Sequence, residues 1–446
     1  MKHILLLGAG QSASTLIEYL LNLLDTKGWK LSIGDVDEAL AQEKGKGKAR
    51  GLAFNVTDQG QLTNEVKNAD LVISMLPARF HMLVANECLK QSKHLVTASY
   101  VNDEMRALHV EAEQKGLVFL NECGLDPGID HMSAMKVIDK IRGEGNELIG
   151  FESFTGGLLA LESEADNPWK YKFTWNPRNV VLAGQGVVKF IQEGTYKFIP
   201  YHRLFRRTEI VHIPKYGEFE GYANRDSLKY LDVYNLRGIR TLYRGTFRRP
   251  GYSKAWNVFV QLGATDDTYK MEGVETMTHR GFINSFLSYN PHDSVELKLA
   301  HYLNLEMEGE IMYKLKWLGV FSNELVGLKE GTPAQILETI LRKKWTLNKE
   351  DRDMIVMWHK FTYLDKANEN KETEIHSTLV TMGEDRVHTA MSKSVGLPLG
   401  IAARLILEDK IQSRGVLIPI IKELYEPIME ELETYGFDFN ESCVFD

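Results

Sequence analysis

The residues best suited to chemistry lie in one short stretch, 121–132, which reads Asn-Glu-Cys-Gly-Leu-Asp-Pro-Gly-Ile-Asp-His-Met. It follows the apolar run 117–120 and precedes a segment with helical periodicity, 132–141. Glycine reaches backbone conformations closed to other residues, proline fixes one dihedral angle, and Asp130 is suited to cap the helix, so we expect a sharp strand-to-helix loop. Acidic side chains and a histidine in such a loop predict a positioned acid or base. The alternative is a tight turn whose polar side chains satisfy local backbone groups.

A second loop near the amino terminus suits a nucleotide. The apolar run His3–Leu7 leads into a G-x-G-x-x-A motif and then an amphipathic helix through Leu16 and Leu24. In this setting the first glycine makes the turn, the second lets backbone amides approach a pyrophosphate, and the alanine permits close packing of helix on strand. The predicted cofactor-binding residues here are Gly8, Gly10, Gln11, Ser12 and Ala13.

The residue after the next strand indicates which dinucleotide binds. Asp35 follows the run Trp29–Ile33, at the distance from the glycines where a carboxylate accepts hydrogen bonds from the adenosine ribose and repels a 2'-phosphate. We therefore expect NAD as the cofactor. NADP stays possible, because lysines that could reach a phosphate stand at 44, 46 and 48.

Strand and helix patterns then alternate up to the opening stretch, which predicts a Rossmann-type, doubly wound parallel sheet of six strands. Ligands bind at the carboxyl ends of such strands. We place Asp58 near the adenine and the segment Met75–Pro77, with Leu76, near the nicotinamide, whereas Ser99 and Tyr100 follow a further strand. Asp58 fits an ordinary helix N-cap equally well.

Composition narrows the class of protein. The chain has 446 residues and a net charge of -8, and no basic run carries interleaved aromatics, so we expect no nucleic-acid partner. The three cysteines show no metal spacing, and we expect neither disulfides nor a metal site. We find no signal-peptide pattern and no apolar stretch of membrane-spanning length, and so expect a soluble cytoplasmic protein.

Beyond residue 148 short aromatic-rich alternating runs predict an antiparallel sheet of an α+β substrate domain. Arg225 and Arg244 are candidates for holding an acidic substrate, because guanidinium groups bind carboxylates through paired hydrogen bonds. Surface ion pairs are the alternative. Residues 263–371 look mainly helical, and the acidic run 350–353 suggests a solvated helix start. Long apolar helices in 385–446 are expected to return to the first sheet.

Several motifs together resemble the saccharopine dehydrogenase family, in its glutamate-forming branch. They run in the same order along the whole chain: the stretch 121–132, Ala98-Ser99-Tyr100, Ser153 with Gly156-Gly157-Leu158, Asn167-Pro168 with Tyr171-Lys172-Phe173, Asn224-Arg225-Asp226-Ser227, Arg244-Gly245-Thr246, Glu350 to Asp353, and Val395-Gly396-Leu397-Pro398.

The resemblance implies a reaction in lysine metabolism: saccharopine interconverts with glutamate and 2-aminoadipate 6-semialdehyde through an imine, with a pyridine nucleotide. It also implies three domains, at 1–132 with 385–446, 133–262 with 372–384, and 263–371, and a homodimer. By motif, the substrate contacts are Ser99, Tyr100, Asp126, Arg225, Gly245, Thr246 and Phe247, and the nucleotide contacts include Leu76, Leu125, Asp126, Pro127 and Thr174. Asp126 or Tyr100 would relay the proton.

The chain also departs from the family pattern. Thr155 stands where the family commonly has cysteine, Leu159–Glu162 replaces a Pro-Ala-Pro-Glu run, and Asp35-Val36 replaces the small-then-arginine pair suited to NADP. Two alternatives therefore stay open. One is a carboxynorspermidine- or homospermidine-type enzyme that uses a diamine, and the other is an NAD-binding redox sensor without catalysis.

Overall fold

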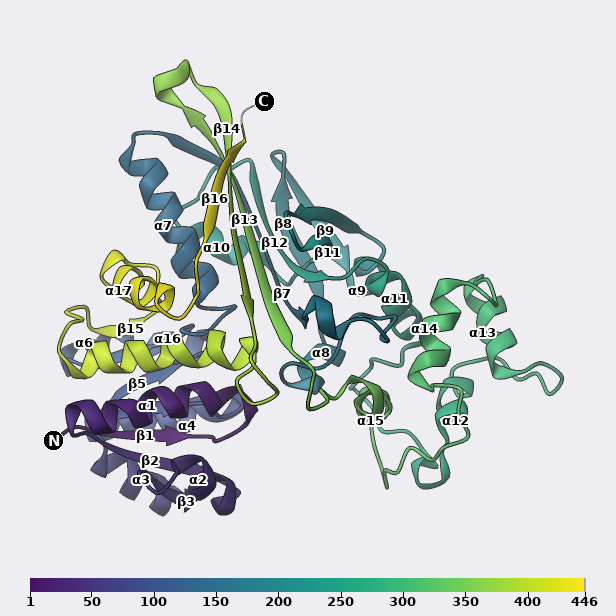
Figure 1. Cartoon of the computed structure of the whole chain (residues 1–446), viewed down its shortest axis with the longest axis horizontal. Coiled ribbons are helices and arrows are strands. Elements are labelled where there is room, and N and C mark those ends of the chain that lie inside the picture. Colours follow the sequence, from purple (N-terminus) through teal and green to yellow (C-terminus); the bar gives the residue numbers. More distant parts are fainter. Residues whose placement is uncertain (445–446) are drawn as a thin grey trace. The chain divides into compact units, whose positions relative to one another are not determined.

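The structure is a computed structural model that describes residues 1–444. The chain divides into two units, of which the first comprises residues 1–148, 363–373 and 379 onward, and the second residues 149–362 and 374–378. The first unit combines segments far apart in the sequence, as Figure 1 shows for its purple amino-terminal and yellow carboxyl-terminal parts.

A parallel sheet of seven strands forms the core of the first unit, in the order β15-β6-β5-β4-β1-β2-β3. Its strands are β1 (His3–Leu7), β2 (Lys30–Asp35), β3 (Arg50–Ala53), β4 (Leu71–Ser74), β5 (His94–Thr97), β6 (Val118–Leu120) and β15 (Gly415–Leu417). The chain order reverses at β1, whose neighbours are β2 and β4, and all pairs are parallel. The predicted doubly wound sheet is confirmed. It has a seventh strand, β15, which was not predicted because its apolar run is only three residues long.

Nine α-helices surround this sheet in the described part of the first unit. They are α1 (Ser14–Lys27), α2 (Glu38–Gly45), α3 (Gln59–Asn68), α4 (His81–Gln91), α5 (Asp103–Ala107), α6 (His109–Gln114), α7 (Ile129–Gly143), α16 (Ala390–Leu407) and α17 (Lys422–Glu433). α16 packs closely on α1 (Figure 1). Glycine at position 396 permits this close approach, since a side chain there would lie only 2.8 Å from the Leu16 amide nitrogen.

The packing of α16 accounts for its apolar character. Against the expectation from the sequence, α16 is long and apolar enough to cross a membrane, and it is the one such helix in residues 1–444. However, 83% of it is buried inside the protein, as in the core helix of a folded domain.

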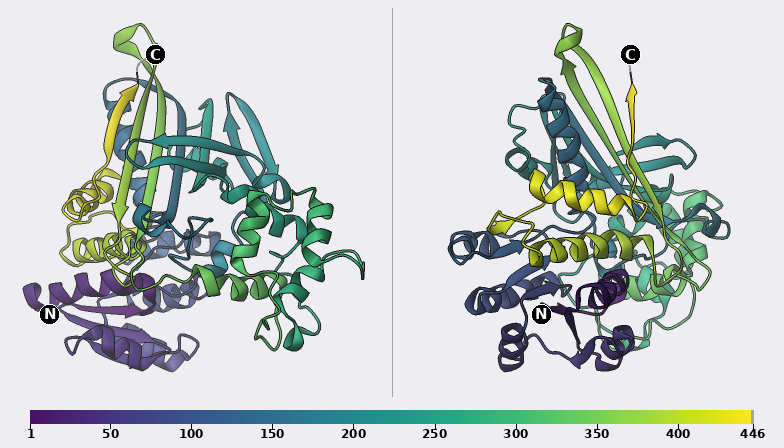
Figure 2. Two further views of the ribbon diagram at one scale, coloured as in Figure 1. Left: turned by 45° about the vertical axis from the view of Figure 1, so that its right-hand side comes forward. Right: turned by 60° about the vertical axis from the view of Figure 1, so that its left-hand side comes forward.

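The second sheet has the order β10-β11-β12-β7-β13-β14-β16, and the hairpin β8–β9 joins it at β12. Its strands are β7 (Glu147–Leu159), β8 (Val187–Gln192), β9 (Thr195–Pro200), β10 (Thr208–Ile213), β11 (Gly217–Ala223), β12 (Thr241–Arg248), β13 (Asp353–Asp365), β14 (Lys371–Met382) and β16 (Asn440–Val444). Both views of Figure 2 show β13 and β14 as long neighbouring green strands. The sheet is mixed, because β7 and β12 run parallel where we expected an antiparallel sheet.

The helices of the second unit are α8 (Pro177–Val181), α9 (Tyr201–Leu204), α10 (Tyr230–Val233), α11 (Tyr252–Leu262), α12 (His279–Asn284), α13 (Val295–Leu303), α14 (Glu310–Leu318) and α15 (Pro333–Trp345). The interpretation of 350–353 as a helix start is wrong, since this run leads into β13. The first seven residues of β13 are all buried, which removes the alternation by which a strand is recognised.

Candidate functional site

The glycine-rich loop has the shape that a pyrophosphate needs. Gly8 has a φ of +101°, and a side chain there would lie 3.2 Å from the Met75 backbone, so glycine is required. At Gly10 a side chain would meet nothing within 4 Å, which leaves open space beside the loop. Neither N-cap residue, Gly10 for the 3-10 turn Gln11–Ala13 or Ala13 for α1, supplies a side-chain cap, and in the first turn of α1 the Thr15 amide donates to the Ser392 hydroxyl at 3.1 Å. Backbone amides at this end of α1 are therefore suited to an anion, and the loop fits a dinucleotide.

Asp35 lies where β2 ends and is fixed against this loop. One carboxylate oxygen accepts a hydrogen bond from the Ala9 amide at 2.6 Å, and the other accepts from the Asp37 amide at 3.0 Å. A carboxylate held in this way presents only acceptors, which suits the hydroxyl groups of a ribose.

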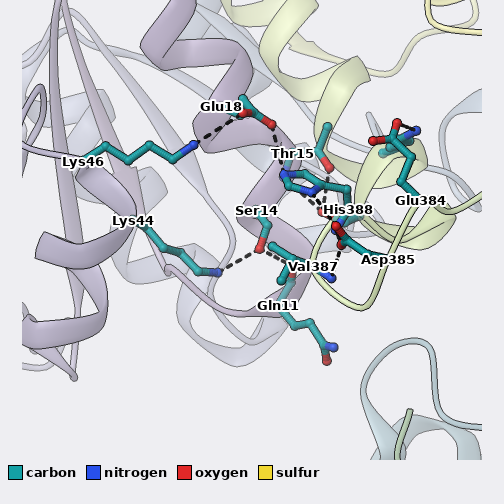
Figure 3. Close-up of polar contacts among 12 residues, drawn as sticks. Gln11, Ser14, Thr15, Glu18, Lys44, Lys46, Glu384, Asp385, Val387 and His388 are labelled. Carbon is teal, nitrogen blue, oxygen red and sulfur yellow. Dashed lines mark hydrogen bonds and ion pairs between the residues drawn. The ribbon is translucent and has the colours of Figure 1, made fainter. Parts of the chain in front are cut away.

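Lys44 reaches the same loop from α2, a contact that the sequence did not reveal. Its ammonium group donates to the Gly10 carbonyl and to the Ser14 hydroxyl, both at 2.9 Å, as Figure 3 shows for Ser14. Burial lowers the pKa of Lys44, whereas the nearby charge of Asp35 acts to raise it. Lys46 and Lys48 bind Glu18 and Asp25 instead. Of these three lysines, Lys44 is thus the one that contacts the glycine-rich loop.

Two further predicted cofactor contacts lie where strands end. Asp58 accepts a hydrogen bond from the Gln61 amide at 3.0 Å and caps α3, so the N-cap interpretation is confirmed and its contact with adenine stays a prediction. Leu76 follows β4 and is half-buried beside the exposed Pro77.

The loop after β6 is a sharp turn in which two glycines touch. Gly124 donates its amide to the Pro127 carbonyl at 2.9 Å, and a side chain on Gly128, with φ at +148°, would overlap the Gly124 carbonyl. The Asp126-Pro127 peptide bond is cis. α7 begins at Ile129, three residues earlier than expected, and Asp130 accepts from the Gly128 amide at 2.6 Å rather than serving as the N-cap residue.

This loop brings the predicted acid-base residues together. The Tyr100 hydroxyl donates to an Asp126 carboxylate oxygen at 2.9 Å. Asp126 is half-buried, and Leu125 and Pro127 on either side are buried. A tyrosine bound to a carboxylate can pass a proton between solvent-accessible and buried groups, which is the chemistry expected of a proton relay.

Two buried histidines support these residues. His131 lies in the stretch that the sequence singled out, whereas nothing in the sequence pointed to His81. Glu122 accepts from the Val101 amide at 2.9 Å and pairs with the fully buried His131 at 2.7 Å, which ties the segment after Tyr100 to the loop. His81 hydrogen-bonds the Ser99 hydroxyl at 2.7 Å and the Ser74 hydroxyl at 2.9 Å. Burial lowers the pKa of His81 to about 4, so this imidazole is neutral at ordinary pH.

The second unit holds the predicted arginines. Arg244 on β12 is 6% exposed, and its guanidinium lies 4.1 Å from the centre of the Tyr230 ring, so it is not a surface residue. Arg225 is exposed and has a φ of +51°. The Asn224 amide donates to the Arg244 carbonyl at 2.9 Å, which joins the two segments.

The neighbouring predicted contacts differ in what they can offer a ligand. A side chain on Gly245 would overlap the Phe154 ring, and Phe247 stacks on that same ring with centroids 5.2 Å apart. Phe247 is fully buried and Thr246 half-buried, so any contact at Phe247 would use its backbone. Thr174 is 2% exposed, and its hydroxyl has no partner among residues 1–444.

No cluster of three or more His, Cys, Asp or Glu side chains suited to a metal occurs in the described part of the chain. A doubly wound sheet, a glycine loop open to a pyrophosphate and a carboxylate at the ribose position define a dinucleotide-binding protein. The Tyr100–Asp126 pair adds an acid-base group, as a dinucleotide-dependent oxidoreductase requires.

Comparison with known proteins identifies the family. The family model described as the saccharopine dehydrogenase NADP binding domain matches residues 4–120, and the one described as the saccharopine dehydrogenase C-terminal domain matches residues 124–437. The chain belongs to the saccharopine dehydrogenase family. Its first unit therefore binds a nicotinamide dinucleotide, and the family and fold class expected from the sequence are confirmed.

Individual relatives match nearly the whole of this chain. The chain is 32% identical to the saccharopine dehydrogenase (NADP(+), L-glutamate-forming) of Pyricularia oryzae, covering 99% of both chains. It is 33% identical to the mitochondrial alpha-aminoadipic semialdehyde synthase of Rattus norvegicus, of which it spans 47%. The apo structure of the saccharopine dehydrogenase (L-Glu forming) of Saccharomyces cerevisiae superposes with a TM-score of 0.89 at 29% identity and full coverage of both chains.

The buried His81 makes a testable contribution to stability. Its pKa is about 4 in the folded chain and about 6.5 when unfolded, so between these values only the unfolded chain binds the proton. The free energy of unfolding must therefore fall as the pH decreases from 6.5 to 4. In His81→Gln this slope should be shallower by up to about 1.4 kcal/mol per pH unit, measured by urea unfolding. The exposed His292→Gln is the control, and equal slopes in all three proteins would show that His81 is not buried as a neutral group.

Proposed function

We propose that this chain is an L-glutamate-forming saccharopine dehydrogenase. The reaction joins the amino group of glutamate to 2-aminoadipate 6-semialdehyde as an imine with loss of water. The imine carbon then accepts a hydride and its nitrogen a proton, which gives saccharopine. The single observation that supports this most strongly is the Tyr100–Asp126 hydrogen bond of 2.9 Å in a family member related to glutamate-forming enzymes over its full length.

The residues of this chain have distinct tasks in the proposal. The dinucleotide supplies the hydride when it is bound, and Asp35 and the glycine-rich loop hold it. Tyr100, through its bond to Asp126, moves the proton of the reacting nitrogen. Neutral His81 fixes the Ser99 hydroxyl next to this pair.

Saccharopine carries three carboxylates, and Arg225 and Arg244 are proposed to bind them. Buried Arg244 is preorganised on Tyr230, which favours charge-assisted hydrogen bonds because little side-chain freedom remains to be lost. Exposed Arg225 sits on the segment that its neighbour Asn224 ties to Arg244. Two cations fit a triacid and would repel a diamine.

The direct test is oxidation of the reduced dinucleotide at 340 nm with glutamate and 2-aminoadipate 6-semialdehyde. Parallel reactions replace glutamate with a diamine or omit the amine. We expect turnover in the reaction that contains glutamate and none in the reactions with the diamine or without an amine. Turnover only with the diamine would make the chain a polyamine enzyme, and dinucleotide binding without any turnover would make it a sensor.

We further propose NAD rather than NADP as the preferred cofactor. The relatives' names and the family description print NADP, and so favour it for the family. In this chain, however, the carboxylate of Asp35 is fixed by two amides at the position of the ribose hydroxyls, where it would repel a 2'-phosphate. Lys44 beside the loop offsets part of that repulsion, so NADP is expected to bind weakly rather than not at all.

Replacing Asp35 tests this preference. In Asp35→Ser the repulsion disappears while Lys44 stays, so the ratio of kcat/KM with NADH to that with NADPH should fall by at least about tenfold. Asp37→Ser, which replaces the exposed carboxylate of the α2 N-cap two residues on by a hydroxyl that can also cap the helix, is the matched control. A ratio that stays constant in Asp35→Ser, or a wild-type protein that prefers NADPH, would contradict the role given to Asp35.

Arg225 is tested by substrate affinity. Arg225→Ala should raise the KM for saccharopine by about ten- to a hundredfold, the loss of one charged hydrogen-bonding group, while the Kd for the dinucleotide is unchanged. Arg237→Ala, at an exposed arginine that pairs with Asp232, is the control. If saccharopine saturates Arg225→Ala at wild-type concentrations, Arg225 does not bind a substrate carboxylate.

Location and assembly are proposed as well. We propose a cytoplasmic homodimer, and exposed Tyr196 and Phe198 on β9, at 58% and 60%, support a contact between copies. Light scattering coupled to size-exclusion chromatography tests the assembly.

A further inference from the structure

A cavity of about 430 Å³ in the second unit lies apart from the arginines described above. Its walls come from β7, β10, β12, β13 and the turn of the β8–β9 hairpin. Successive side chains of a strand point to opposite faces, so Thr241, which lines the cavity, and Arg244 project from opposite faces of β12. The cavity is therefore not part of the arginine cluster.

The charged groups of the cavity do not all neutralise one another. Lys360 pairs with Glu152 at 2.8 Å and also with Glu374, outside the lining, at 3.5 Å, so its charge is already taken up. Glu193 and Glu209 then remain as carboxylates, against one further ammonium group, that of Lys197. Lys197 has no ion-pair partner in the part of the chain that the structure describes. The lining thus offers two carboxylates and one ammonium group to a ligand.

The hairpin turn sets the position of one of these carboxylates. Glu193 and Gly194 both have positive φ, +48° and +70°, which makes a tight two-residue turn between β8 and β9. In this turn the Glu193 carboxylate accepts from the Thr241 hydroxyl at 3.1 Å. The Gln192 carboxamide next to it is bound by Arg207, whose guanidinium lies over the Phe190 ring. Arg207 does not line the cavity, but its charge acts on Glu209 and offsets part of the charge of that carboxylate.

A buried polar atom next to the cavity lacks a partner. Tyr243 is fully buried, and its hydroxyl makes no hydrogen bond within residues 1–444. It follows Thr241 by two positions and is aligned with Glu152 on β7, so it projects from the face that carries the cavity. Burial raises the pKa of Tyr243, the nearby charges of Glu209 and Glu152 raise it further, and the charge of Arg207 acts to lower it. An unsatisfied buried hydroxyl costs stability. Tyr243 lies behind the residues that line the cavity, so a polar ligand group recovers this cost only where a lining side chain moves aside.

We propose that this cavity binds an α-amino acid that carries a second ammonium group. The two ammonium groups would bind Glu193 and Glu209, and the carboxylate would bind Lys197, so that all charges left over in the lining are neutralised. The volume is within the range usual for small-molecule sites. This site is independent of the function proposed above and needs no dinucleotide.

The test is isothermal titration of the full chain, without dinucleotide, with L-lysine as the probe. Norleucine, which lacks the second ammonium group, and 1,5-diaminopentane, which lacks the carboxylate, are the comparison ligands. Lysine is expected to bind at least about tenfold more tightly than either. Glu209→Gln and Lys197→Met should each weaken lysine binding by about tenfold or more, and Lys197→Met should also abolish the preference over 1,5-diaminopentane.

Two control variants distinguish lysine bound in this cavity from lysine bound elsewhere on the chain. Glu369→Gln changes an exposed glutamate outside the cavity and should bind lysine as the wild type does. Arg225→Ala should also bind lysine as the wild type does. If this variant loses lysine binding, lysine binds at the substrate-binding arginines and the proposal is overturned. Absence of binding, equal binding of all three ligands, or unchanged binding in Glu209→Gln and Lys197→Met, with melting curves showing that both variants fold, would overturn it as well.

Discussion

The contact between Gly124 and Gly128 is the constraint on which the acid-base site depends. The two backbones lie so close that a side chain on Gly128 would overlap the Gly124 carbonyl. This closes the loop on itself, with the Gly124 amide bound to the Pro127 carbonyl at 2.9 Å, and leaves Asp126 at its tip. The carboxylate then reaches Tyr100 on a different strand end. Without the close approach of the two glycines, α7 would begin elsewhere and the pair would separate.

Support for this pair comes from buried polar groups that do no chemistry themselves. Glu122 and His131 form a buried pair that also binds the Val101 amide, and His81 bridges the hydroxyls of Ser74 and Ser99. Buried polar groups are costly when unpaired, so such networks permit few arrangements. They fix the strand ends at which substrate is proposed to bind. The contacts of Asp35 and Lys44 with the glycine-rich loop fix the region where the dinucleotide is proposed to bind.

The sequence predicted those features that depend on local backbone chemistry. The glycine-rich loop after β1, the strand-to-helix turn before α7 and an apolar helix within 385–446 are found where they were expected, although α7 begins three residues early. Glycine, proline and the spacing of apolar residues determine such features through a few neighbouring residues. Features that depend on distant partners could not be predicted. The burial of β13 on both faces, the parallel pairing of β7 with β12 and the contact of Lys44 with Gly10 arise only after folding brings remote segments together.

The central claim is that the Tyr100–Asp126 pair moves the proton, while Asp35 and the glycine-rich loop supply most of the affinity for the dinucleotide. Single-turnover measurement of dinucleotide oxidation in Asp126→Asn, together with the dinucleotide Kd from fluorescence titration, tests it most directly. The account predicts that the rate falls by about a hundredfold or more, within the range of general acid-base catalysis, while the Kd changes little. A rate within a few-fold of the wild type would contradict it.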